Sequence, residues 1–416
     1  MSGESGAAPR VRVAVIGAGP AGLMAADRIS AAGHGVAVYE AMPSAGRKLL
    51  MAGRGGLNLT HSEPLDTLLD RYGAARDWMG ALIARFSPDD LRAFALELGQ
   101  ETFVGSSGRI FPRSMKASPL LRAWLGRLAD QGVAFHFRHR WRGIARGHRL
   151  TFETGGERVD LSGFAAVVIA TGGASWPRLG ANGDWVRLLE AQGVGVAPLE
   201  ATNAGVVITW SEVFAARFAG TPLKRVRIGL AASGDPPIDT ELVVTRTGLE
   251  GSGIYALSPG IRAALRANGR AELGIDLRRD LGLEDLTGRL AKGPGKMSMS
   301  NWLRKAAGLP PVAIGLLREV LGARLTADPA ALAGAIKGVR LEVRDMAGLD
   351  RAISTAGGVR LDEIDDNLML RVLPGVFVAG EILNWDAPTG GYLLQGVLAS
   401  GAAAGDGVVR FLASAD

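Results

Sequence analysis

Apolar residues follow two different spacings between Val11 and Glu40. VRVAVIG, which starts at Val11, is almost continuously apolar, as in a buried parallel strand. AGLMAADRISAAG then has apolar residues at helical spacing and stops at Gly33, and HGVAVYE is a second apolar run that ends at Glu40. Two apolar runs joined by an amphipathic helix in about 30 residues predict a β-α-β unit with parallel strands.

The pattern continues with helices and strands up to residue 194. From Ser62 to Gly132 the spacing is mainly helical. VAFHFRHRWRGI and RLTFETGGERVDLSG contain alternating runs and polar turns, which predict antiparallel strands. FAAVVIATGG is another buried strand that ends in a glycine pair, and GDWVRLLEAQG predicts a helix between Gly183 and Gly193.

The pattern changes near residue 195. Short β-rich runs such as NAGVVITW and TELVVTRTG continue to about residue 282, and mainly helical segments with polar faces follow to residue 342. ISTAGGV and GVFVAGE then resemble the strands of the first region. We therefore expect an α/β protein with one discontinuous domain over residues 1–194 and 343–416. A β-barrel-like domain (195–282) and a small helical domain (283–342) are inserted into it.

The composition excludes several classes of chemistry. The chain contains no cysteine, which excludes disulfides, thiolate catalysis and cysteine metal sites and fits a cytoplasmic protein. The N-terminal MSGESGAAPR lacks an apolar core, so we expect no signal peptide. No apolar run reaches the ~18 residues that a membrane span needs, so we expect no membrane partner.

The net charge is +6 and the isoelectric point is about 9.9. Most of the positive charge is arginine and is scattered along the chain, which is typical of a solvated surface. A dense block of Lys and Arg, as in many nucleic-acid-binding segments, is not seen in the sequence. We therefore expect no nucleic-acid partner.

A dinucleotide-binding motif carries the chemistry of the first domain. Gly17, Gly19 and Gly22 form G-x-G-x-x-G, with Pro20 and Ala21 inside it, directly after a strand and at the start of a helix. The first glycine permits the turn, the second lets a pyrophosphate approach the backbone, and the third allows close helix packing. Glu40 ends the second strand, where a carboxylate accepts hydrogen bonds from a ribose and repels a 2′-phosphate. FAD or NAD is therefore expected, rather than NADP.

The C-terminal region favours FAD over NAD. The chain contains one complete motif of this kind and returns to the first domain with VFVAGE and a glycine-rich helix entry. Glu381 is placed to bind a polyol chain, and the bare backbone at Gly390 and Gly391 could face the pyrimidine edge of a flavin. A helix N-terminus there would stabilise the negative charge of a reduced flavin. The alternative is a tightly packed final helix that uses small residues for close contact.

Several motifs in order resemble the bacterial BaiN-type NAD(P)/FAD-dependent oxidoreductases of the glutathione-reductase-like FAD superfamily. The resemblance extends over essentially the whole chain and rests on VIGAGPAGLMAA, AGRKLLMAGRGGLNLTHS, GRIFPRSMKAS, IATGGASWPRLGANGDW, TRTGLEGSGI, STAGGV and PGVFVAGEILNWDAPTGGYLLQGVLASG. It implies a Rossmann-like FAD-binding domain with the two inserts described above. It also implies FAD as the cofactor.

The resemblance implies which residues hold FAD. These are the glycine motif, Glu40 at the AMP ribose, and further positions in the first domain: Lys48, Asn58, Trp141, Thr171, Gly172, Gly173, Gly380, Glu381, Gly390, Gly391 and Tyr392. One loop departs from the family pattern. The family often has Gly-Gly-Gly-Arg-Cys-Asn, whereas this chain has Gly56 and Leu57 at the Arg and Cys positions and an arginine at Arg54. Substrate choice and redox tuning should differ accordingly.

The catalytic residues are not determined by the sequence. His61 is a candidate to face the substrate, and Arg109 together with Lys116 is a candidate to bind a substrate anion. Tyr255 is a candidate to donate a proton. Each has an alternative structural role: a loop histidine, a solvated loop arginine and a core tyrosine. His136 and His139 suit a surface strand better than a metal site, and we expect no metal.

The sequence thus predicts an FAD-dependent oxidoreductase that transfers a hydride between flavin N5 and a small organic substrate. Reduction of an activated C=C bond is one form of this reaction, and NAD(P)H or another carrier would donate electrons. One alternative is a flavin-dependent RNA-modifying enzyme, although such enzymes generally use cysteine, which this chain lacks. A flavin redox sensor without turnover is the other.

Overall fold

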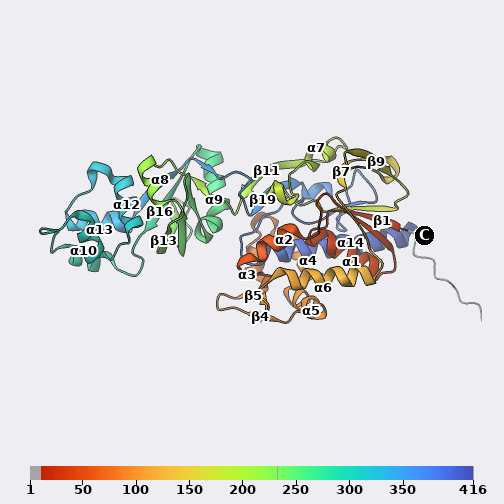
Figure 1. Ribbon diagram of the computed structural model, residues 1–416, viewed down its shortest axis with the longest axis horizontal. Helices are drawn as coiled ribbons and strands as arrows, with labels where there is room; N and C mark the ends of the chain where they lie inside the picture. Colours follow the sequence, from red (N-terminus) through yellow and green to blue (C-terminus); the bar gives the residue numbers. More distant parts are fainter. Residues whose placement is uncertain (1–10, 232, 416) are drawn as a thin grey trace, which may run out of the picture. The chain divides into compact units, whose positions relative to one another are not determined.

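The computed structural model describes residues 11–231 and 233–415. The chain forms two compact units, which are described separately (Figure 1). Unit 1 consists of Met1–Glu200 and Ser354–Asp416, and unit 2 consists of Ala201–Ile353. The predicted division of the inserted part at residue 282 stays a prediction.

Unit 1 is built on a parallel sheet of five strands in the order β20-β10-β1-β2-β6. The bounds are β1 (Val11–Ile16), β2 (Gly35–Glu40), β6 (Ala134–Phe137), β10 (Ala166–Ile169) and β20 (Val376–Val378). The side chains of β10 are all buried, which explains its unbroken apolar sequence. Since β1, helix α1 (Pro20–Ala31) and β2 follow one another, the predicted β-α-β unit is confirmed.

Helix α14 (Tyr392–Ala415) packs along α1, and the two helices approach closely (Figure 1). A methyl group added at Gly401 would lie 2.5 Å from the carbonyl oxygen of Ala21, and one at Gly405 would lie 2.7 Å from Cβ of Arg28. The small residues of α14 are therefore required by helix packing. By length and composition α14 could cross a membrane, but 67% of its most apolar window is buried inside the protein, as in a core helix.

Two regions of unit 1 differ from the sequence prediction. VAFHF does not pair with the following segment but forms β6, which lies parallel to β2 in the central sheet. The antiparallel strands predicted beside it are β7 (Arg140–Ala145), β8 (Arg149–Thr154) and β9 (Glu157–Leu161). Residues 62–132 contain the expected helices, but β4 (Thr102–Val104) and β5 (Arg109–Pro112) interrupt them. Strand β5 pairs with β3 (Thr60–His61) on one side and with β4 on the other.

Several helices and a strand pair complete unit 1. The helices are α2 (Arg47–Ala52), α3 (Leu65–Asp70), α4 (Arg76–Ile83), α5 (Pro88–Glu97), α6 (Ala117–Asp130) and α7 (Trp185–Glu190). The chain leaves unit 1 through β11 (Val196–Thr202) and returns through its sheet partner β19 (Ser354–Val359).

Unit 2 contains a sheet of seven strands that is nearly closed, as the predicted barrel-like insert requires. Its order is β17 (Val339–Val343), β16 (Ala271–Asp276), β13 (Pro222–Leu230), β14 (Ile238–Val244), β15 (Gly248–Glu250), β12 (Val206–Val207) and β18 (Asp345–Met346). The two edge strands, β17 and β18, are separated in the chain by Arg344 alone. The sheet therefore returns almost to its starting edge.

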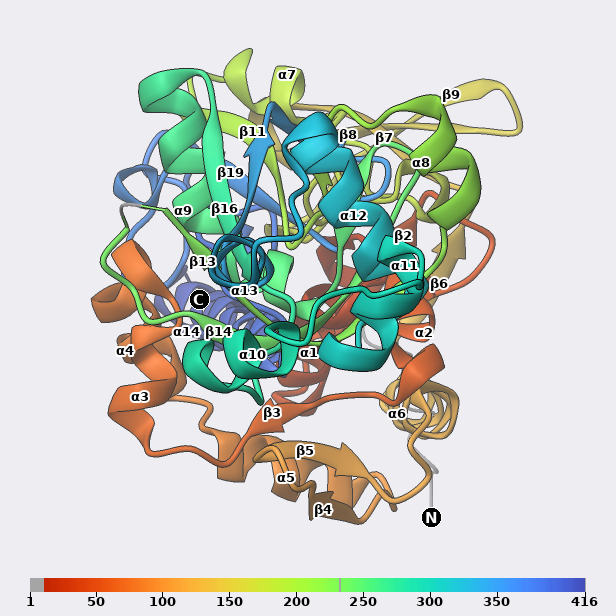
Figure 2. The same cartoon turned by 90° about the vertical axis from the view of Figure 1, so that its left-hand side faces the viewer.

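Helices cover this sheet and share its core (Figure 2). They are α8 (Glu212–Phe218), α9 (Ser252–Asn268), α10 (Leu283–Leu290), α11 (Met299–Trp302), α12 (Pro311–Leu321) and α13 (Pro329–Lys337). A π-helix, Leu303–Ala307, continues α11. Leu290, Trp302 and Leu316 from the helices belong to the same buried cluster as Ile275 and Leu341 from the sheet.

Candidate active site

The glycine turn between β1 and α1 has the geometry that a dinucleotide needs. Gly17 has φ +106°, and a methyl group there would lie 2.4 Å from the carbonyl oxygen of Ala170. A methyl group at Gly22 would lie 2.0 Å from the carbonyl oxygen of Gly17. By contrast, nothing lies within 4 Å of the corresponding position at Gly19, the N-cap of α1. The turn thus presents bare backbone and the start of a helix to open space, as pyrophosphate binding requires.

Glu40 is tied to this turn by its own carboxylate. Its Oε2 accepts a hydrogen bond of 2.8 Å from the backbone N–H of Ala18, and its Oε1 accepts one of 2.8 Å from that of Met42. Burial raises the pKa of Glu40, and these two hydrogen bonds together with Arg47 and Arg140 oppose that shift. Since each carboxylate oxygen has a further lone pair, Glu40 can still accept from ribose hydroxyls.

A partly buried polar network joins four separate segments of unit 1. Lys48 Nζ lies 2.6 Å from Oε2 of Glu381 and 2.5 Å from Oγ of Ser175. The Thr355 N–H donates to Oε1 of Glu381 at 2.9 Å. Thr355 Oγ1 accepts from the N–H groups of Ala174 (2.8 Å) and Ser175 (3.0 Å). The network links α2, β19 and the segments that follow β10 and β20.

The structure thus brings the predicted residues Lys48 and Glu381 together and adds two that the prediction lacked. Ser175 and Thr355 were missed, although Ser175 follows the Gly172-Gly173 pair and Thr355 lies in the STAGGV motif. A methyl group at Gly173 would lie 2.5 Å from Oγ1 of Thr355, which explains the glycine there. Close packing also explains the glycine at Gly380, because a methyl group there would lie 2.8 Å from Cβ of Ala21.

Three buried polar atoms in this region have no hydrogen-bond partner among the described residues. They are Asn58 Oδ1, Thr60 Oγ1 and Thr171 Oγ1. Leaving a buried acceptor or hydroxyl without a partner costs about 1–3 kcal/mol, so these atoms need a partner from outside the chain. Asn58 and Thr171 are among the positions predicted to bind the cofactor. Together with the open space at Gly19, they fit a bound dinucleotide.

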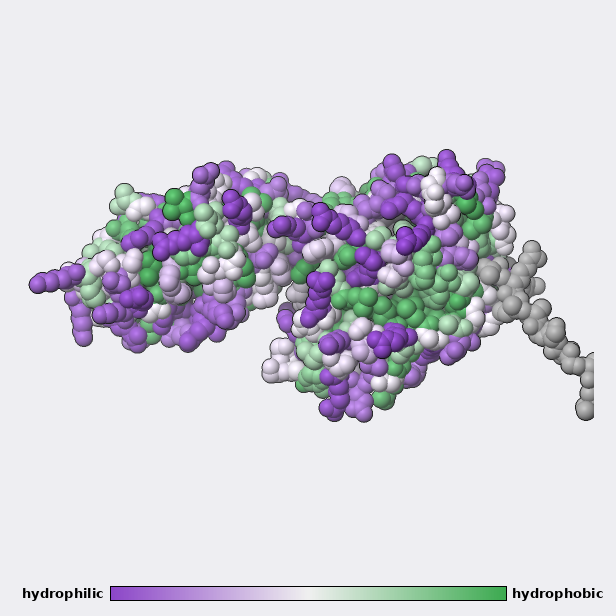
Figure 3. All heavy atoms as spheres, viewed as in Figure 1, coloured by the Kyte–Doolittle hydropathy of each residue, from purple (hydrophilic) through white to green (hydrophobic). Residues whose placement is uncertain are grey.

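The surface near this network is partly apolar. Leu50 of α2, two residues from Lys48, exposes 37% of its surface. Figure 3 shows an apolar area, in green, on this face of unit 1 in the region of α1 and α2, bordered by polar residues. An apolar wall beside a few polar groups is typical of cofactor sites.

The glycines before α14 take part in close packing, which is the alternative that the sequence left open. Gly390 and Gly391 have φ +133° and +102°, and a methyl group on Gly391 would lie 2.6 Å from backbone atoms of Thr60. Gly391 therefore lets β3 approach the start of α14. The prediction that bare backbone here faces a flavin remains untested, but packing against β3 alone accounts for the glycine.

Tyr392 belongs to a cluster with His61, Glu63 and Arg71. The Tyr392 ring stacks on the His61 ring, with centroids 5.4 Å apart. The Arg71 guanidinium also lies over the Tyr392 ring, 5.8 Å from its centroid. Burial, and then Glu63, raises the pKa of Tyr392. Although burial alone would raise the pKa of Glu63, hydrogen bonds from Arg71 and Tyr392 hold it below its ordinary value.

His61 is held by backbone on both ring nitrogens. Its Nδ1 accepts from the N–H of Glu63 at 3.2 Å, so Nε2 carries the proton that it shares with the carbonyl of Ser107 at 3.0 Å. This arrangement matches the structural role that the sequence left open for a loop histidine. Tyr255 lies in α9 of unit 2, where burial, followed by Glu250, raises its pKa.

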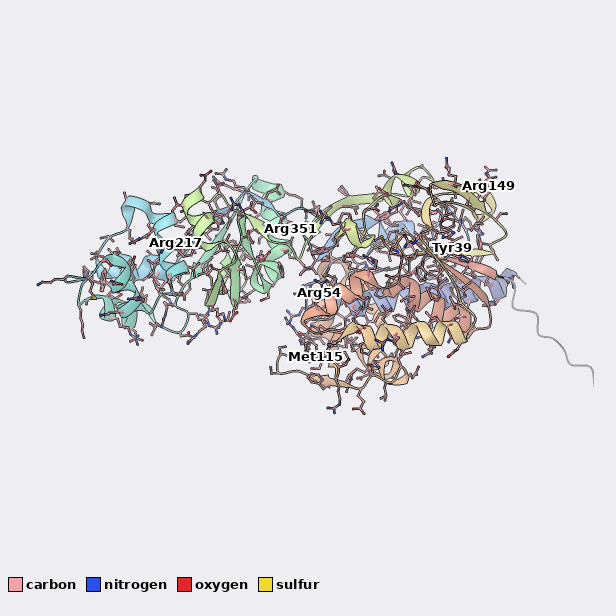
Figure 4. The ribbon with its side chains drawn as sticks, in the orientation of Figure 1. Tyr39, Arg54, Met115, Arg149, Arg217 and Arg351 are labelled. Atoms are coloured by element: carbon pink, nitrogen blue, oxygen red, sulfur yellow. The ribbon has the colours of Figure 1, made fainter. Side chains whose placement is uncertain are left out.

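Three cations lie along the loop at 53–61 and the hairpin beside it. The loop runs along β5, with hydrogen bonds from the Leu57 N–H to Met115 and from the Leu59 N–H to Ile110. Arg54 and Lys116 are exposed and Arg109 is half-buried. Within the described residues, no ion pair or side-chain hydrogen bond engages these three cations. Arg54 and Met115 are labelled in Figure 4.

The departures from the family loop have structural causes. Gly56 has φ +116°, and a methyl group there would lie 2.7 Å from Cε of Met115, so an arginine would not fit without rearrangement. Leu57 is 1% exposed and belongs to the core. Trp141 is also a core residue, and its indole N–H donates to the carbonyl of Gly143 at 2.8 Å, so its contact with a cofactor stays a prediction.

Comparison with known proteins identifies the family. A sequence profile described as HI0933-like protein Rossmann domain matches residues 11–407. The chain belongs to the HI0933-like family. It is an FAD-dependent oxidoreductase with a Rossmann-type FAD-binding domain, which confirms the predicted fold class, cofactor and enzyme class.

Two similar proteins have been assigned different substrates. The chain is 26% identical over 409 residues to a 3-dehydro-bile acid delta(4,6)-reductase of Clostridium scindens, covering 95% of this chain and 98% of that protein. It is also 26% identical over 403 residues to a ribosomal RNA dihydrouridine synthase of Escherichia coli, covering 92% and 94%, respectively.

Solved structures share the fold at lower sequence identity. A 3-ketosteroid delta1-dehydrogenase of Sterolibacterium denitrificans superposes with a TM-score of 0.53 at 13% identity, covering 97% of this chain and 99% of that one. A flavocytochrome c3 fumarate reductase gives a TM-score of 0.52 at 17% identity, covering 98% and 79%. These likenesses concern the fold alone.

Proposed function

We propose that this protein reduces an activated C=C bond with electrons that NAD(P)H supplies through FAD. One observation carries the proposal: two relatives at equal identity over most of the chain have names that describe the same change. A delta(4,6)-reductase and a dihydrouridine synthase both add hydrogen across a C=C bond. In both substrates that bond is conjugated to a carbonyl group, which makes it an acceptor for hydride.

The residues of unit 1 would hold the cofactor as follows. The backbone at Gly19 and the start of α1 bind the pyrophosphate, and Glu40 binds the adjacent ribose. Asn58 and Thr171 supply the buried polar atoms that lack a partner in the chain. Lys48 and Glu381 fix the position of a polyol chain through their mutual ion pair. The bound flavin supplies hydride transfer at N5.

The substrate of the first candidate function is a small organic anion. Arg109 and Lys116 flank the loop that contains Asn58, and neither is neutralised by a carboxylate. The chain has no acidic residue between positions 41 and 62 or between positions 102 and 129, the two segments that form this face. An arginine with no ion-pair partner suits a carboxylate of the substrate. His61 and Tyr392 position the loop, so the proton comes from another source.

The test is an anaerobic reduction followed by a screen of acceptors. NADH or NADPH should bleach the flavin absorption, and an α,β-unsaturated carboxylic acid should restore it. Flavin that stays oxidised with both nucleotides would remove NAD(P)H as the donor. Reduced flavin that no conjugated enone or enoate reoxidises would remove C=C reduction itself.

Arg109→Gln tests the anionic class. The variant should raise KM for the acid at least tenfold and leave the methyl ester of the same compound unaffected. Arg113→Gln is the matched control, because Arg113 is exposed on the same hairpin and pairs with Glu101 at 2.7 Å. Equal effects of the two variants, or of the acid and the ester, would contradict the role of Arg109.

A uridine base in RNA is the second candidate substrate. The Escherichia coli relative favours it, and so does the distribution of charge described below. The protein would be incubated with unmodified ribosomal RNA transcripts and NADPH, and the digested nucleosides would be analysed by mass spectrometry. Dihydrouridine should accumulate only in the presence of both. Its absence, while small enones are turned over, would favour the first candidate.

A further inference from the structure

The excess positive charge of the chain lies entirely in unit 2. Residues 201–353 contain 21 lysines and arginines against 15 aspartates and glutamates, whereas the remaining residues contain 26 of each. The scattered pattern in the sequence therefore conceals a strong asymmetry between the two units. A basic insert on a neutral enzyme indicates a polyanionic partner for the insert.

The charge is concentrated further within the helical part of unit 2. Residues 286–327 contain seven cations and a single carboxylate, Glu319. The cations are all exposed: Arg289, Lys292, Lys296, Arg304, Lys305, Arg318 and Arg324. In the described part of the chain no salt bridge includes any of them. Unpaired cations at this density are unusual for a merely solvated surface, where both signs are normally mixed.

Three arginines meet at a pocket of about 350 Å³ in this region. Arg217 comes from α8, Arg304 from the π-helix and Arg318 from α12, and α8 lies beside α12 in both ribbon views (Figures 1 and 2). Arg217 is labelled in Figure 4. Phe214, Phe218, Ile314 and Gly315 also line the pocket and give it an apolar floor. We call this site the basic pocket.

The floor of the basic pocket depends on a glycine. A methyl group at Gly315 would lie 2.3 Å from Cε2 of Phe218, so only glycine lets that ring pack under α12. The Arg217 guanidinium lies 5.3 Å from the centroid of the same ring. A short π-helix, which supplies Arg304, is a rare element that occurs frequently at functional sites.

The one carboxylate at the basic pocket does not neutralise its arginines. Both oxygens of Glu319 accept hydrogen bonds from Ser211, one from the backbone N–H and one from the hydroxyl. Arg304 donates to the neutral side chain of Asn301 at 3.1 Å. The guanidinium groups therefore keep donors for an external anion, and their planar geometry matches phosphate.

We propose that the basic pocket binds a single-stranded segment of RNA. The three arginines contact consecutive phosphates, the apolar floor receives one base, and the cations of residues 286–327 extend the path of the strand. The inference specifies the surface that the second candidate function needs. Its test measures binding without turnover, so it can fail while the flavin chemistry stands.

The experiment is a fluorescence anisotropy titration of the full-length protein with a labelled single-stranded RNA of mixed sequence at several salt concentrations. Removing three phosphate contacts should make the slope of log K against log[salt] less negative by about 2, since each contact contributes about −0.7 for single strands. The variant is Arg217→Gln combined with Arg304→Gln and Arg318→Gln. We expect it to bind RNA at least tenfold more weakly.

The matched control is the triple variant Arg146→Gln, Arg149→Gln and Arg158→Gln in the β7–β9 region of unit 1. These arginines are also exposed, so the net charge changes equally. Retained RNA binding in the control and loss in the pocket variant would support the proposal. Equal losses in both, unchanged binding in the pocket variant, or no binding by the native protein would overturn it.

Two further measurements protect the interpretation. The flavin spectrum and the thermal unfolding of the pocket variant should match those of the native protein. If its folding is affected, Arg304→Lys in place of Arg304→Gln should restore part of the affinity for RNA, because lysine keeps the positive charge. A small anion such as cholate is titrated in parallel. Saturable binding of cholate at the basic pocket without any RNA affinity would overturn the assignment to RNA.

Discussion

Gly19 and Gly391 show that the same residue type can be required for opposite reasons. Gly19 has an ordinary φ of −80° and open space in front of it, whereas Gly391 has φ +102° and backbone of Thr60 in contact range. A methyl group at Gly19 would occupy space that only a ligand needs. A methyl group at Gly391 would disrupt the chain itself.

We therefore expect Gly19→Ala to weaken FAD binding with little effect on the stability of the apoprotein. Gly391→Ala should lower the unfolding free energy of the apoprotein by about 2 kcal/mol or more, because strain and contact with Thr60 are added. Denaturant titrations of both apoproteins, with FAD titrations alongside, check this pair. An apoprotein of Gly391→Ala as stable as the native one would remove the packing explanation.

Glu40 accepts hydrogen bonds from the backbone of the turn and is proposed to bind the ribose of FAD, so its replacements should have different effects on folding and on FAD binding. Glu40→Arg removes both acceptors that hold Ala18 and Met42 and introduces a charge beside Arg47 and Arg140. We expect this variant to purify without flavin and to unfold at lower temperature. Glu40→Gln keeps one acceptor and should retain FAD roughly tenfold more weakly, since a hydrogen bond to a charged group contributes about 1.5–3 kcal/mol. Full flavin occupancy in Glu40→Arg would contradict the ribose assignment.

Glu63 makes the start of α14 sensitive to acid. Its folded-state pKa is lowered, so its carboxylate stabilises the fold above the unfolded pKa, and this contribution is lost as the pH falls through the folded pKa. The stability difference between the native protein and Glu63→Gln should therefore shrink between about pH 5 and about pH 3. Denaturation midpoints across this range provide the measurement, and a difference independent of pH would be inconsistent with the hydrogen bonds from Arg71 and Tyr392.

At the scale of elements, Thr355 joins β19 to the segment after β10. Thr355→Val keeps the shape of the side chain but leaves the buried N–H groups of Ala174 and Ser175 without their acceptor. We expect a loss of about 1–3 kcal/mol in unfolding free energy. Thr355→Ser keeps the hydroxyl and should lose clearly less. A Val variant as stable as the Ser variant would show that the hydroxyl contributes nothing.

The elements also show what a sequence can specify. Strands β1, β2 and β10 and helix α1 could be predicted because their periodicity and glycine turn are local features. The placement of β6 beside β2, and of β3 beside Gly391, depends on contacts between distant segments, so periodicity did not reveal it. Lys48 came from the family resemblance and Glu381 from its place at the end of a strand, whereas Ser175 and Thr355 became visible only through their hydrogen bonds.

At the scale of the whole molecule, the distribution of charge and the apolar cores follow the same division of the chain into two units. The asymmetry in charge appears only after the chain is divided at residues 200 and 354, because acidic residues of unit 1 mask it in the total. The large apolar cluster of unit 2 is drawn from residues between Val206 and Val343, with no residue from unit 1. Each unit therefore has its own core and its own electrostatic character.

An independent core of this kind predicts independent folding. The segment 201–353, expressed by itself, is about as long as a typical single domain and should unfold in one cooperative transition. It should also bind single-stranded RNA within about threefold of the whole protein, since the basic pocket lies inside it. Leu317→Asp, which places a carboxylate at a fully buried position, gives the unfolded reference. Circular dichroism melts and anisotropy titrations measure the two properties separately.

A segment that folds cooperatively but does not bind RNA, while the whole protein does, would place the RNA surface outside unit 2. A segment that melts gradually and binds hydrophobic dyes would show that unit 1 is needed for its stability.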